Sequence, residues 1–381
     1  MINMLSHLFS RSATRVCILF FLLFCSFNAG ARIIVTDAKT GEPLPRASIF
    51  DNKGLFIGVA DEEGVIPASI TASSFPLNIR YIGYEPAIAQ STDAVVALNE
   101  SSYELPEIVV NNVDRNMLHI IAYERVFSSG MDNTDTLNYF TERIVDFMIP
   151  LNKKTKYKGW KKSRVLAERN YRHIKRDRKD LKVDTLTYSE NKKSSSGTSY
   201  DLSDTYIIPE ELLSGKATKM VIDGKYYPED TWTVIGDNYF LYRDNLADEK
   251  DHVMSPGILK ALGMTTDFTK YEQFFKFHPD TKGKIRADRI DQSAVFLDIV
   301  MRGKVMKWAS GQKGSITINS YGELFVIDRE YLTVDEAKDL KKNPPEINAS
   351  TFTAPENAPA IPAETQALKD AVIKASKKSE N

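Results

Sequence analysis

Cysteine is almost missing from this chain. The sequence of 381 residues contains two cysteines, Cys17 and Cys25, and both lie near the N-terminus. The rest of the chain therefore has no thiol for a disulfide, for a metal site or for nucleophilic catalysis. An excess of charge of one sign is also lacking, because the chain has 50 basic and 51 acidic residues. The net charge names no partner.

Long hydrophobic runs are absent after the first 31 residues. The one such run, Val16 to Phe27, follows Arg11 and Arg15 and precedes the small residues Ala29 and Ala31. It is shorter than the roughly 20 residues that cross a bilayer. Residues 1–31 are therefore predicted to be a secretory signal peptide that is cleaved after Ala31.

Two expectations follow from this leader. A lipoprotein signal at Cys25 is the alternative, but Phe24 stands where a small residue is needed. We therefore expect an exported chain without lipid, in the periplasm or at the periphery of the outer membrane. No later run predicts a transmembrane span.

Histidine is scarce, and no catalytic motif surrounds it. After the leader the chain has His119, His173, His252 and His278, none within three or four residues of another. The patterns H-E-x-x-H and G-x-S-x-G are absent, and no glycine-rich phosphate loop follows a strand. The sequence predicts no catalytic residue, no cofactor site and no metal site.

Residues 32–110 have the pattern of short strands between turns. Leu77, Ile79 and Tyr81 alternate with Asn78 and Arg80, as in a strand with one buried face. In "TGEPLP" one glycine and two prolines form a stiff connection that ends one strand and begins the next. These signals predict an antiparallel β-sandwich.

Four motifs in this region resemble a known family. "VTDAKTGEPLPRASIF", "GVADEEG", "IRYIGYEP" and "LPEIVV" occur in the order found in the carboxypeptidase regulatory-like (transthyretin-like) domain. The resemblance implies an accessory β-sandwich without catalytic activity. Arg46 departs from the family pattern, where glycine is usual, and Ala60 stands where threonine is usual.

The same family suggests one class of partner. In TonB-dependent receptors this domain often precedes a plug and a barrel, but too few residues follow here to build that barrel. A free-standing accessory of outer-membrane receptor assemblies remains one interpretation.

The sequence pattern of residues 111–342 predicts an α+β domain, and no family is recognised for it. The spacing of Leu137, Phe140, Ile144 and Phe147 predicts a helix over 135–149, and a similar pattern predicts another over 116–127. Antiparallel strands follow: a three-stranded meander through Asp223-Gly224, and a second block that includes "GSITINS" and "GELFVID". A capping-box pattern at Thr333 to Glu336 predicts a short terminal helix.

Residues 343–381 are rich in proline and alanine. With few large apolar side chains, this stretch is predicted to be a disordered tail.

One stretch of the chain is strongly basic. Residues 153–182 contain 14 lysines and arginines and three acidic residues. One interpretation is a solvated face, and the other is a surface for an anionic partner, with charge that attracts it and an aromatic ring that inserts or stacks. The candidate surface consists of Lys158, Trp160, Lys161, Lys162 and Arg164.

The sequence favours a mainly β, non-catalytic envelope protein that binds a macromolecular partner. The partner would be an envelope protein, a glycan or an anionic lipid surface. Nucleic acid is disfavoured by export. A hydrolase that acts on envelope polymers through a dispersed active site is the alternative function.

Overall fold

The computed structural model describes residues 32–54, 56–101, 115–131, 135–151, 154–177, 179, 182–191, 206–222, 229–236, 238–246, 263–277, 284–285, 289–303 and 315–379. The predicted signal peptide, with Ala29 and Ala31, lies outside this part of the chain, as does the segment "LPEIVV".

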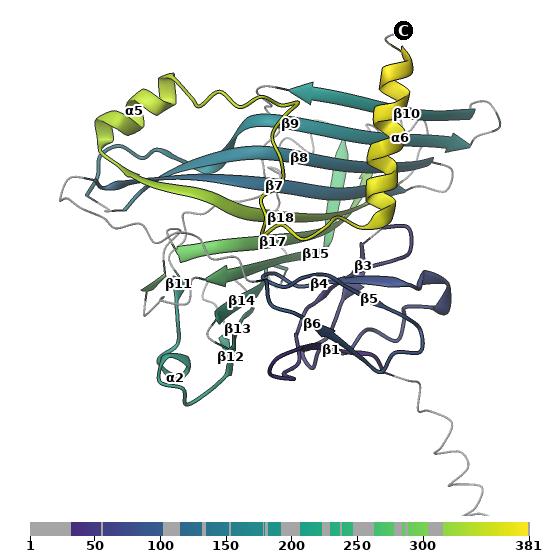
Figure 1. Cartoon of the computed structure of the whole chain (residues 1–381), viewed down its shortest axis with the longest axis horizontal. Coiled ribbons are helices and arrows are strands. Elements are labelled where there is room, and N and C mark those ends of the chain that lie inside the picture. The colour runs from purple at the N-terminus through teal and green to yellow at the C-terminus, as the bar shows by residue number, and fades with distance from the viewer. Residues whose placement is uncertain are drawn as a thin grey trace, which may run out of the picture.

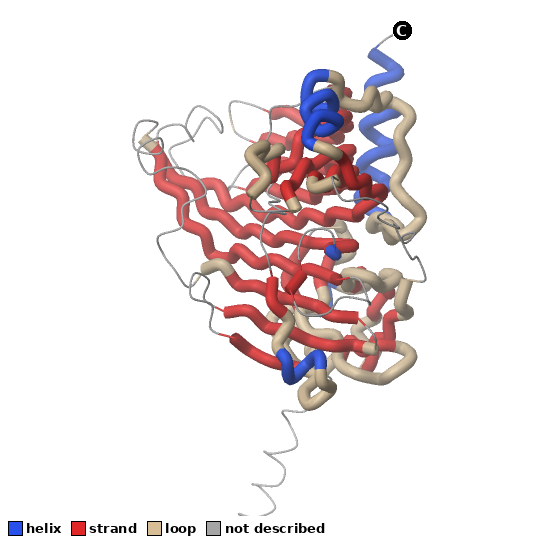
Figure 2. Tube along the Cα trace, turned by 90° about the vertical axis from the view of Figure 1, so that its left-hand side faces the viewer, coloured by secondary structure: helices blue, strands red, loops and turns tan. Residues whose placement is uncertain are grey.

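The fold is mainly β, and its centre is one ten-stranded antiparallel sheet (Figure 1). The strand order is β10-β9-β8-β7-β18-β17-β15-β14-β13-β12. The sheet is twisted and curved, and its strands run across the view in Figure 2. Its strands are β7 (Met117–Met131), β8 (Asp135–Pro150), β9 (Trp160–Asp177), β10 (Lys182–Asn191), β12 (Lys219–Ile222), β13 (Glu229–Ile235), β14 (Asn238–Asp244), β15 (Met264–Phe277), β17 (Ile290–Gly303) and β18 (Ser315–Leu332).

The two helices predicted at 116–127 and 135–149 are wrong. Those residues form β7 and β8, which pair antiparallel from Met117↔Pro150 to Met131↔Thr136. Both strands are buried on both faces for much of their length. Such strands lose the period of two, and their apolar residues then fall at helical spacings by chance.

The strand predictions for the later part of this region hold with one correction. The meander is confirmed as β12, β13 and β14, which pair antiparallel in sequence order, while its turn at Asp223-Gly224 lies outside the described residues. "GSITINS" and "GELFVID", however, form a single strand, β18, in which Gly322 lies opposite Val126 and Val295. A glycine inside a strand is tolerated when both neighbours pair with it.

Small elements complete this region. Helix α5 (Val334–Lys342) begins with the predicted capping box, in which Thr333 and Glu336 bond to each other's backbone N–H. The remaining elements are β11 (Tyr206–Ile207), which pairs with β16 (Lys284–Ile285), and helix α2 (Glu210–Leu213).

Residues 32–101 form a smaller unit, called the N-terminal unit. It has an antiparallel sheet with the order β3-β2-β4-β5 and a parallel pair, β1 and β6. Leu77 and Ile79 face its core, as the alternation predicted, together with Leu44. Its elements are β1 (Ile34–Asp37), β2 (Ser48–Phe50), β3 (Phe56–Val59), the 3₁₀ turn η2 (Ala72–Ser74), β4 (Leu77–Arg80), β5 (Ala87–Ala89) and β6 (Val95–Leu98).

The "TGEPLP" connection is a turn held by Asp37. The Asp37 carboxylate accepts hydrogen bonds from the backbone N–H groups of Lys39 (2.7 Å) and Thr40 (2.6 Å), and from the Tyr84 hydroxyl (2.7 Å). Gly41 has a φ of 73°, a conformation that glycine adopts without steric cost. The glycine and the carboxylate together explain why the chain reverses at this point.

The predicted disorder of residues 343–381 is not what the structure has. Residues 343–362, called the strap, cross the large sheet, and helix α6 (Ala363–Ser379) packs on β9 and β10. Ile347 and Phe352 of the strap contact a core cluster of the sheet, and Val372 of α6 is fully buried. The few apolar residues of this segment suffice because the sheet supplies the other side of each contact.

The N-terminal unit and α6 lie on the same side of the large sheet, which we call the α6 face (Figures 1 and 2). A buried ion cluster joins the three parts. Glu323 of β18 accepts from Arg80 of β4 (3.0 Å) and from Arg125 of β7 (2.5 Å). Both arginines also donate to backbone carbonyls of the strap, those of Ala360 and Pro359.

Candidate ligand-binding groove

An open groove lies where the N-terminal unit, the α6 face and α6 meet. Its volume is about 440 Å³, within the range of small-molecule sites. Lys53 and Gly54 of the N-terminal unit form part of one wall, and Glu364 and Leu368 of α6 form part of another. The groove therefore exists only when three distant parts of the chain are assembled.

A row of polar side chains crosses the sheet along this groove. Asn319, Ser129, Asn138 and His173 are directly opposite one another on the adjacent strands β18, β7, β8 and β9. Residues that are opposite in antiparallel strands project from the same face, at intervals of about 4.8 Å. All four line the groove. The Oδ1 atom of Asn138 is buried and has no hydrogen-bond partner among the described residues.

An aromatic row runs beside the polar one. Tyr321, Phe127, Phe140 and Tyr171 occupy the positions two residues along the same strands, and Tyr188 of β10 lies opposite Tyr171. All five therefore share the α6 face. Phe127 and Phe140 have ring centroids 5.0 Å apart and line the groove. The lining is therefore apolar on one side and hydrogen-bonding on the other.

Helix α6 is fixed over the aromatic row by a lysine as well as by apolar contacts. The Lys369 ammonium donates to Glu142 (3.0 Å) and lies 5.5 Å and 5.2 Å from the ring centroids of Phe140 and Tyr171. Although burial opposes it, the nearby Lys369 and Arg169 charges hold the pKa of Glu142 below its usual value. The carboxylate is thus kept ionised, and it anchors the helix that forms one wall.

The helix approaches the N-terminal unit closely at Gly54. This glycine has a φ of 70°, and a Cβ atom placed on it would lie 3.1 Å from Thr365 Oγ1 and 3.2 Å from Glu364 Cβ. Any other residue would be strained and would press against the first turn of α6. Gly54 therefore sets how closely the two walls approach.

His173 is held by Asp184. The His173 Nε2 atom lies 2.6 Å from the Asp184 Oδ1 atom. A carboxylate only accepts, so Nε2 carries the proton, and Nδ1 of a neutral ring is left as an acceptor. Both residues line the groove.

This pair does not extend to a serine nucleophile. Ser129 lies on β7 and His173 on β9, with β8 between them. Two strand spacings amount to roughly 9–10 Å, whereas a nucleophile and its base must lie within about 3 Å. The arrangement can orient a ligand, but these residues do not form a nucleophile–base pair.

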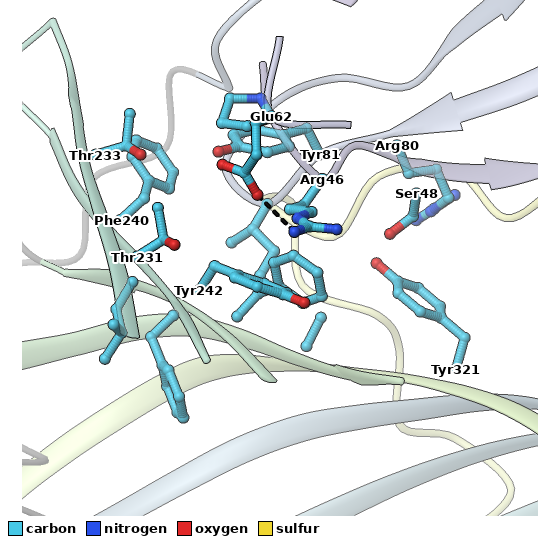
Figure 3. A pocket seen from close by; sticks show the side chains of 16 residues that line it. Arg46, Ser48, Glu62, Arg80, Tyr81, Thr231, Thr233, Phe240, Tyr242 and Tyr321 are labelled. Carbon is cyan, nitrogen blue, oxygen red and sulfur yellow. Dashed lines mark ion pairs between the residues drawn. The ribbon is translucent and has the colours of Figure 1, made fainter. Parts of the chain in front are cut away.

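A second cavity lies at the junction between the N-terminal unit and the sheet (Figure 3). Its volume is about 20 Å³, enough for about one water molecule. Arg46 lies at its centre, forms an ion pair with Glu62 (2.6 Å), and has its guanidinium 4.4 Å from the Tyr242 ring centroid. This cavity therefore belongs to the packed interface between the N-terminal unit and the large sheet.

Arg46 has a backbone conformation that is unusual for a residue other than glycine. It has a φ of 62°, in the left-handed region where a glycine is strain-free. An arginine there carries a backbone cost of about 1 kcal/mol. Its contacts with Glu62 and Tyr242 offset that cost, so the residue joins the N-terminal unit to β14.

The candidate anionic-partner surface is only partly accessible. Trp160 donates from Nε1 to the backbone and side chain of Asp146, both at 3.2 Å. Arg164 donates to the same carboxylate (2.5 and 2.9 Å) and lies 4.2 Å from the Trp160 ring centroid. Lys158 is exposed and donates to the Thr155 carbonyl. The side chains of Lys161 and Lys162 are outside the described structure.

Carboxylates of β8 form ion pairs with three arginines of the basic stretch. Its arginines at 164, 169 and 176 form ion pairs with Asp146, Glu142 and Asp135, and all three carboxylates are buried. Strand pairing places these acids beside the arginines, although up to 41 positions separate them in the sequence. Three arginines of the stretch are thus paired with buried acids, whereas Lys156, Lys158 and Lys175 are exposed.

Sequence reasoning missed the residues of the groove. His173 has no partner close to it in the sequence, and Asn138 and Ser129 belong to no motif. One signal was present: the three residues lie at matching positions in "SSGM", "DTLNYF" and "YRHIKR", which pair as consecutive strands. It becomes visible only when β7 and β8 are recognised as strands.

Neither a metal centre nor a membrane-spanning helix is found among the described residues. No group of three His, Cys, Asp or Glu side chains in that part of the chain is arranged to hold a metal ion. No described helix combines the length and apolar character needed to cross a membrane.

Comparisons with known proteins give little. No family model matches this chain, and no curated protein matches it. A solved structure titled "Lipid-protein interactions in lipovitellin" is similar over 57% of this chain and 26% of its own, with 10% identity and a TM-score of 0.28. The chain spans about a quarter of that structure, and a likeness at this level carries no argument about function.

Proposed function

We propose that this chain is a non-catalytic binding protein of the bacterial envelope, and that the groove is its binding site. The observation that carries the proposal is the assembly of that groove from residues of the N-terminal unit, the α6 face and α6. A site built largely on strands holds its side chains in fixed positions, as recognition requires.

The N-terminal unit would serve as a docking module. We propose that it is a transthyretin-like sandwich of the carboxypeptidase regulatory-like family. The antiparallel order β3-β2-β4-β5, and the turns at Gly41 and Arg46 within the family motif, support this assignment. In this protein the module contributes the turn at Lys53 and Gly54 to the groove.

The chain would meet its partner outside the cytoplasm. The basic n-region, the apolar run and the small residues at Ala29 and Ala31 support export to the periplasm or to the outer-membrane periphery. In that compartment the available partners are envelope proteins and glycans, together with lipid surfaces. N-terminal sequencing of the exported chain should begin at or near Arg32, and an acylated Cys25 would contradict this part of the proposal.

Filling the groove tests the binding function. Ala371 is exposed and lines the groove, so Ala371→Trp places a large ring in it. Lys374→Trp, three residues further along the exposed side of α6, is the matched control. The purified protein is sedimented with envelope fractions of the cells that produce it.

We expect wild type and Lys374→Trp to co-sediment equally, and Ala371→Trp to be retained at least tenfold less. Unfolding midpoints should be the same for the three proteins, because both substitutions are at the surface. Equal retention of all three would exclude the groove as the binding site.

A further inference from the structure

We propose that the groove binds an uncharged saccharide, such as the end of an envelope glycan. This inference rests on the proposed function and names its ligand class. A pyranose ring has apolar C–H faces and an edge of hydroxyl groups. The groove has the same two-sided character, with partly buried apolar side chains such as Leu186 and Leu368 beside the polar row.

The hydrogen-bonding groups of the row suit hydroxyls. A hydroxyl both donates and accepts, and each asparagine amide offers two donors and one acceptor. Asn138 and Asn319 supply such amides, and Ser129 supplies a hydroxyl.

The spacing of the row also fits rings. From Asn319 to His173 the row spans three strand intervals, roughly 14 Å. That length accommodates two or three successive sugar units, each within reach of one or two polar side chains. The volume of about 440 Å³ is in keeping with such an occupant.

The charges of the groove disfavour an anion. The described lining contains one lysine, Lys53, no arginine, and the carboxylates Asp184 and Glu364. Asp184 is bonded to His173, so its negative charge lies at the end of the polar row. A phosphate or a uronic acid would meet these carboxylates without the cluster of cations that anion recognition uses. An uncharged ligand gains the hydrogen bonds without that repulsion.

Titration calorimetry on the full chain tests the ligand class. The probes are three neutral trisaccharides (maltotriose, mannotriose and triacetylchitotriose), with trigalacturonate as the acidic comparator and trialanine as the peptide comparator. We expect at least one neutral trisaccharide to bind, and to bind at least tenfold more tightly than either comparator.

Variants locate the site. Asn138→Ala and His173→Ala should each weaken binding of that trisaccharide at least tenfold, because each removes a partner of the ligand. Thr187→Ala is the control, since Thr187 is exposed on β10 and adjoins Leu186, so it projects from the opposite face. Unfolding midpoints measured in parallel identify any variant that fails to fold, and Asn138→Asp then replaces Asn138→Ala as a test with preserved shape.

Each other outcome overturns the inference. If no neutral trisaccharide binds while Ala371→Trp still abolishes retention on envelope fractions, the saccharide class is wrong and the binding function stands. Preference for trigalacturonate or trialanine would lead to the same conclusion. Saccharide binding that survives both groove variants would place the sugar elsewhere. If retention is also insensitive to Ala371→Trp, the proposed function fails together with the inference.

Discussion

Arg80 and Glu323 form a two-pronged ion pair across 243 positions of the sequence. The Arg80 Nε atom lies 3.0 Å from Glu323 Oε1, and Nη2 lies 3.1 Å from Oε2. The side chains are 2% and 7% exposed. Although burial opposes it, the charges of Arg125 and Arg80 hold the pKa of Glu323 below its usual value. This pair fixes the N-terminal unit on the sheet that forms the floor of the groove.

Removing Glu323 should destabilise the protein strongly. Glu323→Ala leaves two buried guanidinium groups, those of Arg80 and Arg125, without their carboxylate. Breaking a buried pair in this way costs about 3–5 kcal/mol in free energy of unfolding. Urea unfolding followed by circular dichroism measures the loss.

A surface pair provides the control for this measurement. Arg302 and Asp267 are paired at the surface, and both side chains are more than half exposed. Arg302→Ala should cost less than about 1 kcal/mol. Equal losses for the two variants would show that the buried cluster does not stabilise the docking of the N-terminal unit.

Glu124 should make stability fall as the pH rises. Burial raises the pKa of this carboxyl to about 7, from an ordinary value of 4.5. Below pH 4.5 the group is protonated in both the folded and the unfolded chain. Between pH 4.5 and 7 the unfolded chain ionises first, so folding is progressively disfavoured, by about 3 kcal/mol in total.

Glu124→Gln should remove that dependence. The amide keeps the shape of the side chain and does not ionise, while Arg143 keeps its bond to Glu168 (2.5 Å). We expect the variant to be more stable than wild type at pH 8 and similar at pH 4.5, in urea unfolding at both values. Parallel profiles for the two proteins across this range would show that Glu124 ionises normally.

Substitution of Arg164 should lower stability more than substitution of Lys158, although both residues belong to the basic stretch. Asp146 is fully buried, and Arg164→Gln removes its charged partner. His119 and Trp160 remain bonded to Asp146, so we expect a loss of roughly 2–3 kcal/mol, less than for an isolated buried pair. Lys158→Gln should change stability by less than about 0.5 kcal/mol.

The same two variants bear on the anionic-partner surface. If binding to vesicles that contain acidic lipid falls for Lys158→Gln and weakens with salt, the exposed lysine contributes to such a surface. If only Arg164→Gln changes, and its stability changes with it, the role of Arg164 is structural.

Helix α6 should detach when its buried face is charged. Val372 is fully buried against the aromatic row, so Val372→Asp places an unpaired carboxylate there. We expect proteolytic cleavage within residues 363–379 to become at least tenfold faster. Lys374→Asp, on the exposed side of the helix, should leave the cleavage rate unchanged. Equal rates for both variants would mean that α6 is not held by this contact.

The helix prediction failed for an identifiable reason. In β8, Phe140, Thr141 and Glu142 are all buried. One face of the strand is covered by α6, and the other face is covered by the core on the opposite side of the sheet. A strand buried on both sides shows no alternation, and nothing in its own residues reveals the second layer. Where the apolar residues of a strand lie on one face, as Leu77 and Ile79 do, the alternation predicted the strand correctly.

The groove could not be predicted for a related reason. Asn138, Ser129 and His173 are ordinary polar residues in the sequence, and only their register makes them a row. Register depends on which strands pair, and strand pairing is a long-range property that no local pattern contains.

The sequence by itself determined what depends on neighbours along the chain. The turn at Asp37 and Gly41, the capping box at Thr333 and the meander of β12 to β14 each involve backbone conformations that nearby side chains set. Only the tertiary structure decided which charges are neutralised and where a ligand can sit. Ion pairs such as Arg80 with Glu323, and the walls of the groove, form between residues that are brought together by burial of apolar surface across the whole chain.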